Sequence, residues 1–109
     1  LIAFAEAVSR TLRPGDLFGR LGGEEFAVIL PEISDAEAQA LAEQVREQVA
    51  ATGIVLDGGQ PVYVTVSIGM VRLRCRARSS MEIALAAADQ ALYAAKAAGR
   101  NRVVTVDPI

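Results

Sequence analysis

Two adjacent glycines followed by two glutamates, Gly22-Gly23-Glu24-Glu25, most constrain how this chain can fold. Apolar residues lie on both sides of them, within 17–21 and throughout 26–30. Two short apolar runs separated by a glycine-containing turn predict a β-hairpin with the glutamates at its tip. The glycines supply the turn's backbone angles and leave room for a phosphate or a base, whereas neighbouring carboxylates repel each other. A divalent cation such as Mg²⁺ would relieve that repulsion, although the four residues alone fit a plain solvated tip better than a metal site.

The composition indicates one small domain in which only oxygen atoms are available to hold a metal. Of the 109 residues, 52% are hydrophobic and 22% charged, and the net charge of −2 gives no general attraction to nucleic acid or anionic membranes. Histidine is absent, which excludes imidazole-based catalysis and the commonest zinc ligand. The single cysteine, Cys75, cannot form an internal disulfide, and we expect it to be a packing residue. No apolar run approaches the roughly 18 residues of a membrane span, and no basic signal-peptide segment opens the chain.

Three stretches have the apolar periodicity of amphipathic helices, at 1–12, after Ser34 and after Ser79. The second and third open with the capping-box pattern S-x-x-E, which pairs Ser34 with Glu37 and Ser79 with Glu82. The many alanines of the third helix predict close packing against a sheet. The residues expected to face inward are Ile2, Ala5, Val8 and Leu12 in the first helix, Ala38, Leu41, Ala42, Val45 and Val49 in the second, and Ile83, Ala87, Ala91, Leu92 and Ala95 in the third.

A strand is predicted at 62–70, where apolar residues occupy every even position and are expected to face the core. The same parity continues with arginines at 72, 74, 76 and 78, which a core does not accept. The strand is therefore expected to leave the sheet near Val71. The alternating arginines fit a solvated edge or loop better than a surface for phosphate or an acidic partner. A short last strand is predicted at 103–106.

The segment Arg13-Pro14-Gly15-Asp16 ends the first predicted helix, because proline disfavours helix in the residue before it and glycine permits a turn. The same segment places a guanidinium and a carboxylate three positions apart. A guanidinium offers paired donors to guanine or phosphate, and a carboxylate can accept a hydrogen bond from a guanine edge. On these residues alone, simple punctuation between helix and strand and a ligand site both remain open.

Four segments of the chain, in order and at matching separations, resemble the GGDEF domains, the diguanylate cyclases of bacterial signalling. They are Arg20–Leu30 followed by Pro31, Val64–Gly69, Ala88–Tyr93 and Lys96–Arg102. Glu24 stands at the position of the motif's aspartate, a carboxylate variant that the family also uses. The resemblance spans nearly the whole chain from Arg13 onward, which makes it highly specific.

The resemblance implies an α+β fold, a ferredoxin-like or nucleotidyl-cyclase-like sandwich with helices packed on a largely antiparallel sheet. GGDEF domains carry, upstream of the region seen here, a first central strand with a metal-binding Asp, followed by an Asn and an Asp that read guanine. Residues 1–109 are therefore expected to be a partial GGDEF domain, its C-terminal two-thirds, with the N-terminal part absent. The missing strand would lie between those at 26–30 and 62–70, so we expect these two strands not to pair with each other.

The resemblance implies the condensation of two GTP molecules into cyclic di-GMP and pyrophosphate. Two domains, each holding one GTP, face each other, and the 3′-hydroxyl of each GTP attacks the α-phosphate of the other. Glu24 would ligate Mg²⁺ or Mn²⁺ and help to deprotonate the hydroxyl, in a displacement that two metal ions can assist. Glu25 would support the metal or the substrate, while Gly22 and Gly23 would line the nucleotide.

Two further pairs take ligand-binding roles from the resemblance. Lys96 and Arg100 lie at and just beyond the end of the third predicted helix, where cations also complement the helix dipole. In the family this pair contacts the phosphates of GTP. Arg13 and Asp16 match the family's inhibitory R-x-x-D motif, in which both residues bind the product, cyclic di-GMP, and so provide product inhibition.

The implied partners are GTP, cyclic di-GMP, a second GGDEF domain in a catalytic homodimer and an upstream sensory or regulatory domain, without nucleic acid. The implied location is the cytoplasm, including the cytoplasmic part of a membrane-anchored sensor. Because the upstream metal-binding and guanine-binding residues are absent, the 109 residues alone are expected to be inactive. A second class of function stays open, an inactive module that senses cyclic di-GMP through Arg13 and Asp16. The intact Gly-Gly-Glu-Glu favours the enzyme, since an inactive domain need not keep the carboxylates.

Overall fold

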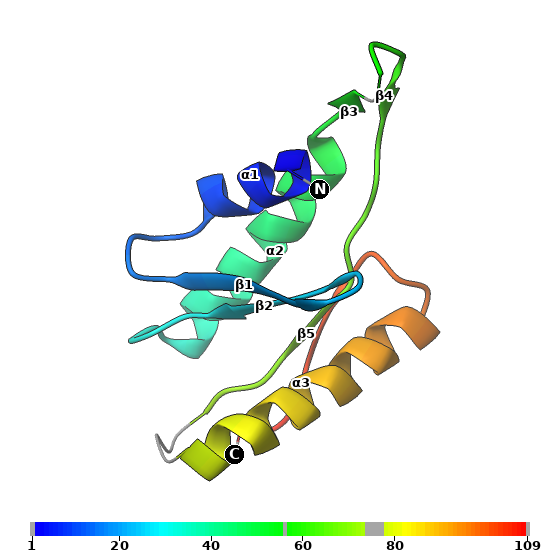
Figure 1. Cartoon of the computed structure of the whole chain (residues 1–109). Helices are drawn as coiled ribbons and strands as arrows, with labels where there is room; N and C mark the ends of the chain where they lie inside the picture. The colour runs from blue at the N-terminus through cyan, green and yellow to red at the C-terminus, as the bar shows by residue number, and fades with distance from the viewer. Residues whose placement is uncertain (1, 56, 74–77, 109) are drawn as a thin grey trace.

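The computed structural model describes residues 2–55, 57–73 and 78–108 and has the mixed helix and strand content predicted for the chain (Figure 1). The helices in these ranges are α1 (Ile2–Thr11), α2 (Asp35–Ala51) and α3 (Arg78–Ala97). The strands are β1 (Leu17–Gly22), β2 (Glu25–Ile29), β3 (Ile54–Val55), β4 (Pro61–Val62), β5 (Ile68–Met70) and β6 (Val103–Thr105). Cys75 and the arginines at 74 and 76 lie outside the described residues. Within the described ranges, no helix combines the length and apolar character that a bilayer crossing requires.

The strands of the described ranges form three separate two-stranded ladders. β1 pairs with β2 and β3 pairs with β4, both antiparallel, as in hairpins. β5 pairs with β6 in parallel, and α3 provides the crossover connection that a parallel pair needs. β2 and β5 belong to different ladders, as the predicted strand order requires.

The core lies between α1 and α2 and is built from small and medium-sized aliphatic side chains. Ala7 and Val8 of α1 and Val45 and Val49 of α2 form its buried cluster, each 8% exposed or less. The partly buried side chains that pack against this cluster are Phe4, Leu12, Phe18, Val66 and Ile68. Because Phe18 belongs to β1 and Ile68 to β5, strands from two different ladders attach to the same layer of helices.

The inward face of α1 includes Val8 and continues to Leu12 just beyond the helix, as the periodicity predicts, but it does not follow the whole predicted stripe. Ile2 is 76% exposed rather than buried, and the inward face runs through Phe4 and Val8. The Phe4 ring packs against Phe18 of β1 and Phe26 of β2, with ring centroids 6.5 and 4.9 Å away. A large ring gains more from burial than a residue at the open end of the helix. The aromatic cluster therefore sets the rotation of α1 and holds the β1–β2 hairpin against it.

α2 begins at the predicted capping box. Ser34 is the N-cap residue, and its Oγ accepts a hydrogen bond from the N–H of Glu37 at 3.2 Å and donates one to Glu37 Oε1 at 2.8 Å. These bonds satisfy a backbone donor that the helix itself leaves unpaired. Four of the five residues predicted to face inward are buried, namely Leu41, Ala42, Val45 and Val49.

The predicted strand at 62–70 is interrupted. β4 ends at Val62, β5 begins at Ile68, and residues 63–67 belong to no ladder. Val62 and Val64 are 46% and 38% exposed, so the prediction that every even position faces the core is wrong at this end. A ladder needs partners for its N–H and C=O groups, and no strand of the described chain pairs with 63–67.

The chain leaves the sheet where predicted, because β5 ends at Met70, next to Val71. Arg72, the first of the alternating arginines, then pairs with Asp35 in the first turn of α2, with 3.0 Å from Nη1 to Oδ2. Both side chains are at least half exposed. An exposed ion pair of this kind agrees with the solvated interpretation of this segment.

α3 packs directly on β5 and β6 through small side chains, as the alanine content predicts. The helix begins at Arg78, so the predicted capping box at Ser79 is wrong, because an N-cap residue lies outside its helix. Ile83 is also 56% exposed rather than inward, since the close approach of the strands selects the alanine face. Within residues 80–97 of α3, the buried ones are Ala84, Ala91 and Ala95.

Gly69 is the point where β5 and α3 approach each other most closely. A methyl group at this position would overlap the carbonyl oxygen of Ala88 and the amide nitrogen of Leu92, and would lie 2.9 Å from the carbonyl carbon of Ala91. All three are backbone atoms of a helix, which cannot rotate away as a side chain can. Ile68 packs against the α1–α2 cluster, so β5 is contacted from both sides, although its three residues stay partly exposed (Figure 1).

Gly69→Ala is expected to lower the free energy of unfolding by about 1–3 kcal/mol, the usual cost of overpacking a tight contact. Gly19→Ala is the matched control, because a methyl group there meets no heavy atom within 4 Å, and its effect should stay within about 0.5 kcal/mol. Urea unfolding followed by circular dichroism measures both. Equal unfolding midpoints for the two variants would contradict the close contact at Gly69.

Candidate functional site

The β1–β2 hairpin places the two glycines and two glutamates at one tight turn. Gly22 pairs with Glu25, which leaves Gly23 and Glu24 as the two turn residues. The φ angles of Gly22 and Gly23 are 153° and 51°, in a region that residues with a side chain rarely adopt. The register also shifts between Arg20 and Gly22, as in a β-bulge. The hairpin predicted from the Gly-Gly pair is thus confirmed.

Arg20 holds this turn from within β1. Its Nε and Nη2 atoms donate hydrogen bonds to the carbonyl oxygen of Gly23 at 3.1 and 2.7 Å. A guanidinium that grips one carbonyl through two donors restrains the backbone on which Glu24 is carried. No role for Arg20 was predicted from the sequence, in which the only signal was a cation three residues before a glycine of the turn.

The turn is open to a ligand. Glu24 and Glu25 are both exposed, and a Cβ atom at Gly22 or Gly23 would meet no heavy atom within 4 Å. In the described ranges, no group of three or more histidine, cysteine or acidic side chains gathers to hold a metal. Mg²⁺ is commonly bound through one or two carboxylates together with water and substrate phosphates. The donor set therefore fits a magnesium ion bound with a nucleotide rather than a closed metal site.

Arg13 and Asp16 contact each other directly in the turn between α1 and β1. Nε and Nη2 of Arg13 donate to the Asp16 carboxylate at 2.7–3.2 Å, and the Arg13 backbone N–H donates to Oδ2 at 2.7 Å. The Asp16 side chain is 1% exposed and that of Arg13 is 35% exposed. The hydrogen bonds from Arg13 lower the pKa of Asp16 against the opposing effect of burial, and the same contact raises the pKa of Arg13.

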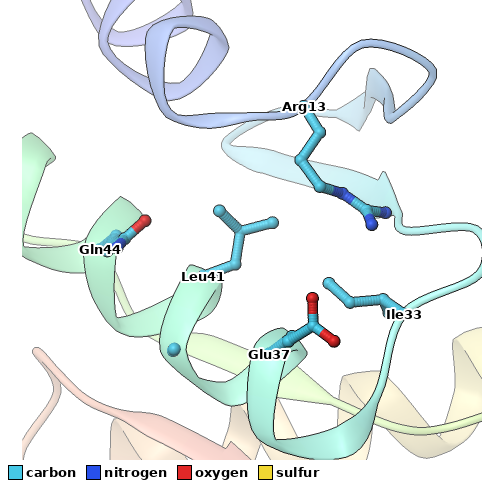
Figure 2. A pocket seen from close by; sticks show the side chains of 6 residues that line it. Arg13, Ile33, Glu37, Leu41 and Gln44 are labelled. Carbon is cyan, nitrogen blue, oxygen red and sulfur yellow. The ribbon is translucent and has the colours of Figure 1, made fainter.

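Two hollows flank Arg13. Its Nη2 atom also donates to the carbonyl oxygen of Pro31 at 2.7 Å, which ties the turn to the end of the hairpin. One hollow of about 390 Å³ is lined by the turn 13–16 and by Pro31 and Glu32. The other, of about 240 Å³, lies between Arg13 and α2 (Figure 2). The remaining residues that line the second hollow are Ile33, Glu37, Ala40, Leu41 and Gln44.

The α2 side of the second hollow was not predicted from the sequence. Figure 2 shows the Glu37 carboxylate and Leu41 rising from α2 towards the Arg13 side chain. Glu37, Leu41 and Gln44 follow one another at spacings of four and three, so they share one face of the helix. From the sequence, the spacing shows only that these three residues lie on one face of α2. The fold shows that this face meets the turn that carries Arg13.

Lys96 and Arg100 lie at the C-terminal end of α3, as predicted. Lys96 belongs to the last turn of the helix and Arg100 to the loop that follows, and both are exposed. The N–H of Arg100 donates to the carbonyl oxygen of Ala95 at 2.9 Å. Their side chains are thus two accessible cations at a helix terminus that itself carries partial negative charge.

The structure places the predicted site residues in three groups, namely the turn 22–25, the pair Arg13 and Asp16, and the pair Lys96 and Arg100. Within the described part of the chain, no hydrogen bond or ion pair joins one group to another. The first two groups belong to segments at opposite ends of β1, whereas the third lies at the C-terminal end of α3 and in the loop that follows. Each group is therefore a separate local feature.

Known proteins resemble this chain over nearly its whole length. The family described as "Diguanylate cyclase, GGDEF domain" matches residues 1–102. Among curated proteins, the chain is 44% identical over 107 residues to the probable diguanylate cyclase DgcT of Escherichia coli (strain K12), which covers 94% of this chain and 23% of that protein. The chain spans about a quarter of the length of the curated relatives that it matches.

Solved structures share its fold. Diguanylate cyclase SiaD from Pseudomonas aeruginosa, in complex with its activator SiaC, matches with a TM-score of 0.85 and 34% identity over 96% of this chain and 39% of that chain. The GGDEF domain of DgcB from Caulobacter crescentus, in complex with c-di-GMP, matches with a TM-score of 0.80 and 31% identity over 94% of this chain and 60% of that chain. These matches confirm the predicted fold class. Because the family match and the structural matches cover nearly every residue, the chain belongs to the GGDEF domain family of diguanylate cyclases.

Proposed function

We propose that the protein carrying this chain condenses two GTP molecules into cyclic di-GMP and pyrophosphate. The observation that carries the proposal is the turn 22–25, which keeps both glycines and both carboxylates and is exposed to solvent. The glycines alone satisfy the backbone of the turn, so folding does not explain two adjacent exposed acids. Membership of the GGDEF family supplies a class of reaction that explains why both acids are present.

The residues of the turn divide the work between nucleotide and metal. Gly22 and Gly23 leave their backbone accessible, so a nucleotide can lie directly against it. Glu24 offers its carboxylate to Mg²⁺ or Mn²⁺ and accepts the proton of the attacking 3′-hydroxyl, while Glu25 supports the metal or the substrate. When bound, the metal neutralises charge at the reacting phosphates. Arg20 keeps the turn in place through Gly23.

Lys96 and Arg100 bind the phosphates of GTP. The displacement at the α-phosphate releases pyrophosphate, a strongly anionic leaving group that fixed cations stabilise. Both side chains are exposed at one end of α3, four residues apart. The end of α3 carries Lys96 directly and supports the start of the loop that carries Arg100.

A second copy of the domain completes the reaction. Each product molecule contains two GMP units, and this chain presents a single Gly-Gly-Glu-Glu turn. A homodimer in which two such turns face each other brings one GTP against the other. The complex of SiaD with an activator supports control of the family by other proteins, and we place a regulatory domain upstream and the protein in the cytoplasm, where GTP is available.

Cyclic di-GMP also binds at Arg13 and Asp16 and inhibits the enzyme from there. The complex of the DgcB domain with c-di-GMP supports a binding function of this kind. Arg13 uses Nε and Nη2 for its internal hydrogen bonds, whereas Nη1 donates to none of the described residues and is available to guanine or phosphate. The hollows on both sides of Arg13 leave room for the ligand.

A second candidate function is an inactive module that senses cyclic di-GMP. It is favoured by the Arg13–Asp16 pair, which is already formed and needs no contact with the turn 22–25. The turn has only two acids of its own, and no further acid of the described ranges gathers around them. Turnover of GTP separates the two candidates.

Glu24→Ala in the full-length protein is expected to lower the rate of cyclic di-GMP formation by about 100-fold or more, because it removes a metal ligand. Glu24→Asp is the matched control, since it keeps a carboxylate at the same position and should retain most of the activity. Chromatographic detection of product from GTP and Mg²⁺ measures both variants. An unchanged rate in Glu24→Ala would contradict the metal-binding role of Glu24. A wild-type protein that binds cyclic di-GMP but does not turn over GTP would support the sensor function instead.

Arg13→Ala is expected to weaken cyclic di-GMP binding by about tenfold to a hundredfold, as for loss of a charged hydrogen bond. Arg10→Ala is the control, because Arg10 is exposed on α1 and lines neither hollow. Arg13→Lys keeps the charge beside Asp16 but loses the planar fork, and should bind with intermediate affinity. Isothermal titration calorimetry decides the matter, and equal affinities for wild type and Arg13→Ala would remove the site.

Acid should destabilise the fold partly through Asp16. Its pKa is lowered in the folded state, so its pairing stabilises the fold fully above the ordinary value of about 3.9 and loses that effect as the pH falls through the folded pKa. We expect the urea midpoint of the wild type to fall as the pH drops below about 4, and to fall less in Asp16→Asn. Parallel pH profiles for both proteins would contradict this assignment.

A further inference from the structure

The loop after α3 has an unusual backbone. Gly99, Arg100 and Asn101 all have positive φ, with angles of 124°, 65° and 47°. Glycine adopts this region freely and asparagine tolerates it, but for arginine it is strained. Arg100 is one of the two cations assigned to the GTP phosphates. The direction in which its side chain leaves the helix end therefore depends on an unfavourable conformation, which needs support from its surroundings.

Part of that support is local. The N–H of Arg100 donates to the carbonyl oxygen of Ala95 at 2.9 Å, and its own carbonyl accepts a hydrogen bond from Nε of Arg102 at 3.0 Å. The Arg102 guanidinium lies over Gly99, where an added methyl group would come within 2.7 Å of Nη2. These contacts all come from the loop and the last turns of α3, so they cannot fix the loop relative to the rest of the fold.

Long-range support comes from two elements. The N–H of Ile68 in β5 donates to the carbonyl oxygen of Arg102 at 2.9 Å, just after the left-handed positions. At those positions, the long-range contact is made by Arg46 on α2. Its Nη1 atom donates to Oδ1 of Asn101 at 3.0 Å, across 55 residues of sequence. Its Nε and Nη2 atoms donate to Oε2 of Glu43, one turn earlier on the same helix, at 3.0 and 2.9 Å. Glu43 thus orients the guanidinium, and the remaining Nη1 donor is directed at Asn101. The Arg46 side chain is 22% exposed, which strengthens these bonds relative to fully solvated ones.

We propose that Arg46 is a positioning residue for nucleotide binding. By holding Asn101, it keeps the loop in its left-handed conformation and so fixes the direction of Arg100 towards the phosphates of a nucleoside triphosphate. The inference rests on the proposed role of Arg100. In this proposal Arg46 does not contact the nucleotide. It acts through the loop backbone that carries Arg100, the residue that does.

The chain offers a matched control for this contact. Oγ1 of Thr105 in β6 donates to Oε1 of Gln39 at 2.8 Å, so this second long-range bond also ties α2 to the segment after α3. Thr105 follows the loop by four residues, and its side-chain hydrogen bond goes to Gln39 and not to a left-handed position. Thr105→Val removes this bond without disturbing the Arg46 contact. A purely structural tether should behave alike at both places, whereas a positioning contact should not.

The test measures the affinity of the full-length protein for a non-hydrolysable GTP analogue with Mg²⁺, by calorimetry at a temperature where every variant is folded. Arg46→Ala is expected to weaken binding by about tenfold, because displacement of a positioned group is costly. Thr105→Val should leave the affinity unchanged. In an Arg100→Ala background, Arg46→Ala should have no further effect, because the two residues act through one contact.

Variants of Asn101 separate the hydrogen bond from the backbone angle. Asn101→Asp keeps an acceptor for Arg46 and should retain more affinity for the analogue than Asn101→Gly does, although its added charge opposes the phosphates. Asn101→Gly keeps the conformational freedom but loses the acceptor, and should resemble Arg46→Ala. If Asn101→Gly binds normally, the backbone angle alone matters and the proposal is overturned.

The outcomes also distinguish a failure of the role of Arg46 from a failure of the role of Arg100, on which it rests. If Arg100→Ala leaves the affinity unchanged, the assigned role of Arg100 fails, and the role of Arg46 fails with it. If Arg100→Ala weakens binding while Arg46→Ala does not, only the positioning role is overturned. Equal losses in Arg46→Ala and Thr105→Val, or additive losses in Arg46→Ala and Arg100→Ala, would likewise show that Arg46 acts as a general tether.

Discussion

The structure depends on one short strand, β5, that is contacted by helices from both sides. Ile68 packs into the layer of α1 and α2, and the missing side chain of Gly69 lets α3 approach on the other side until backbone meets backbone. β6 pairs with β5 along its length. The loop that carries Arg100 joins α3 to β6, so its location follows from this packing. The β1–β2 hairpin is attached separately, through the aromatic contacts of Phe4, Phe18 and Phe26 with α1.

Arginine side chains shape all three candidate ligand regions by holding oxygen atoms of irregular segments. Arg20 grips the carbonyl of the glutamate-bearing turn, Arg13 reaches the carbonyl of Pro31, and Arg46 holds the loop after α3. A guanidinium suits this task, because its planar set of donors can satisfy a carboxylate and a second acceptor at once. The net charge of −2 gives no hint of this. The region of Lys96 and Arg100 is locally cationic, whereas the hollows beside Arg13 and the turn 22–25 also carry acidic side chains.

Local rules predicted the features that depend on neighbours in sequence. The capping box of Ser34 and Glu37 and the hairpin turn are both settled by contacts within a few residues, and both are found. The inward face of α1 was predicted only in part, and the course of 63–67 was predicted wrongly. The first depends on an aromatic partner more than ten residues away, and the second on whether any strand lies beside the segment. Periodicity shows that a face is apolar, but not what covers it.

The candidate site divides in the same way. The sequence by itself predicted which residues carry chemistry, and it did so through the resemblance to the GGDEF domains. Taken alone, the Gly-Gly-Glu-Glu turn, the pair Arg13 and Asp16, and the cations at the end of α3 also fit purely structural roles. Only the tertiary structure decided that Arg13 and Asp16 bond each other, that α2 supplies a wall beside Arg13, and that Arg46 reaches Asn101. These contacts join segments that are far apart in sequence or depend on side-chain direction. Their partners are chosen by the packing of whole helices and strands, which no local pattern records.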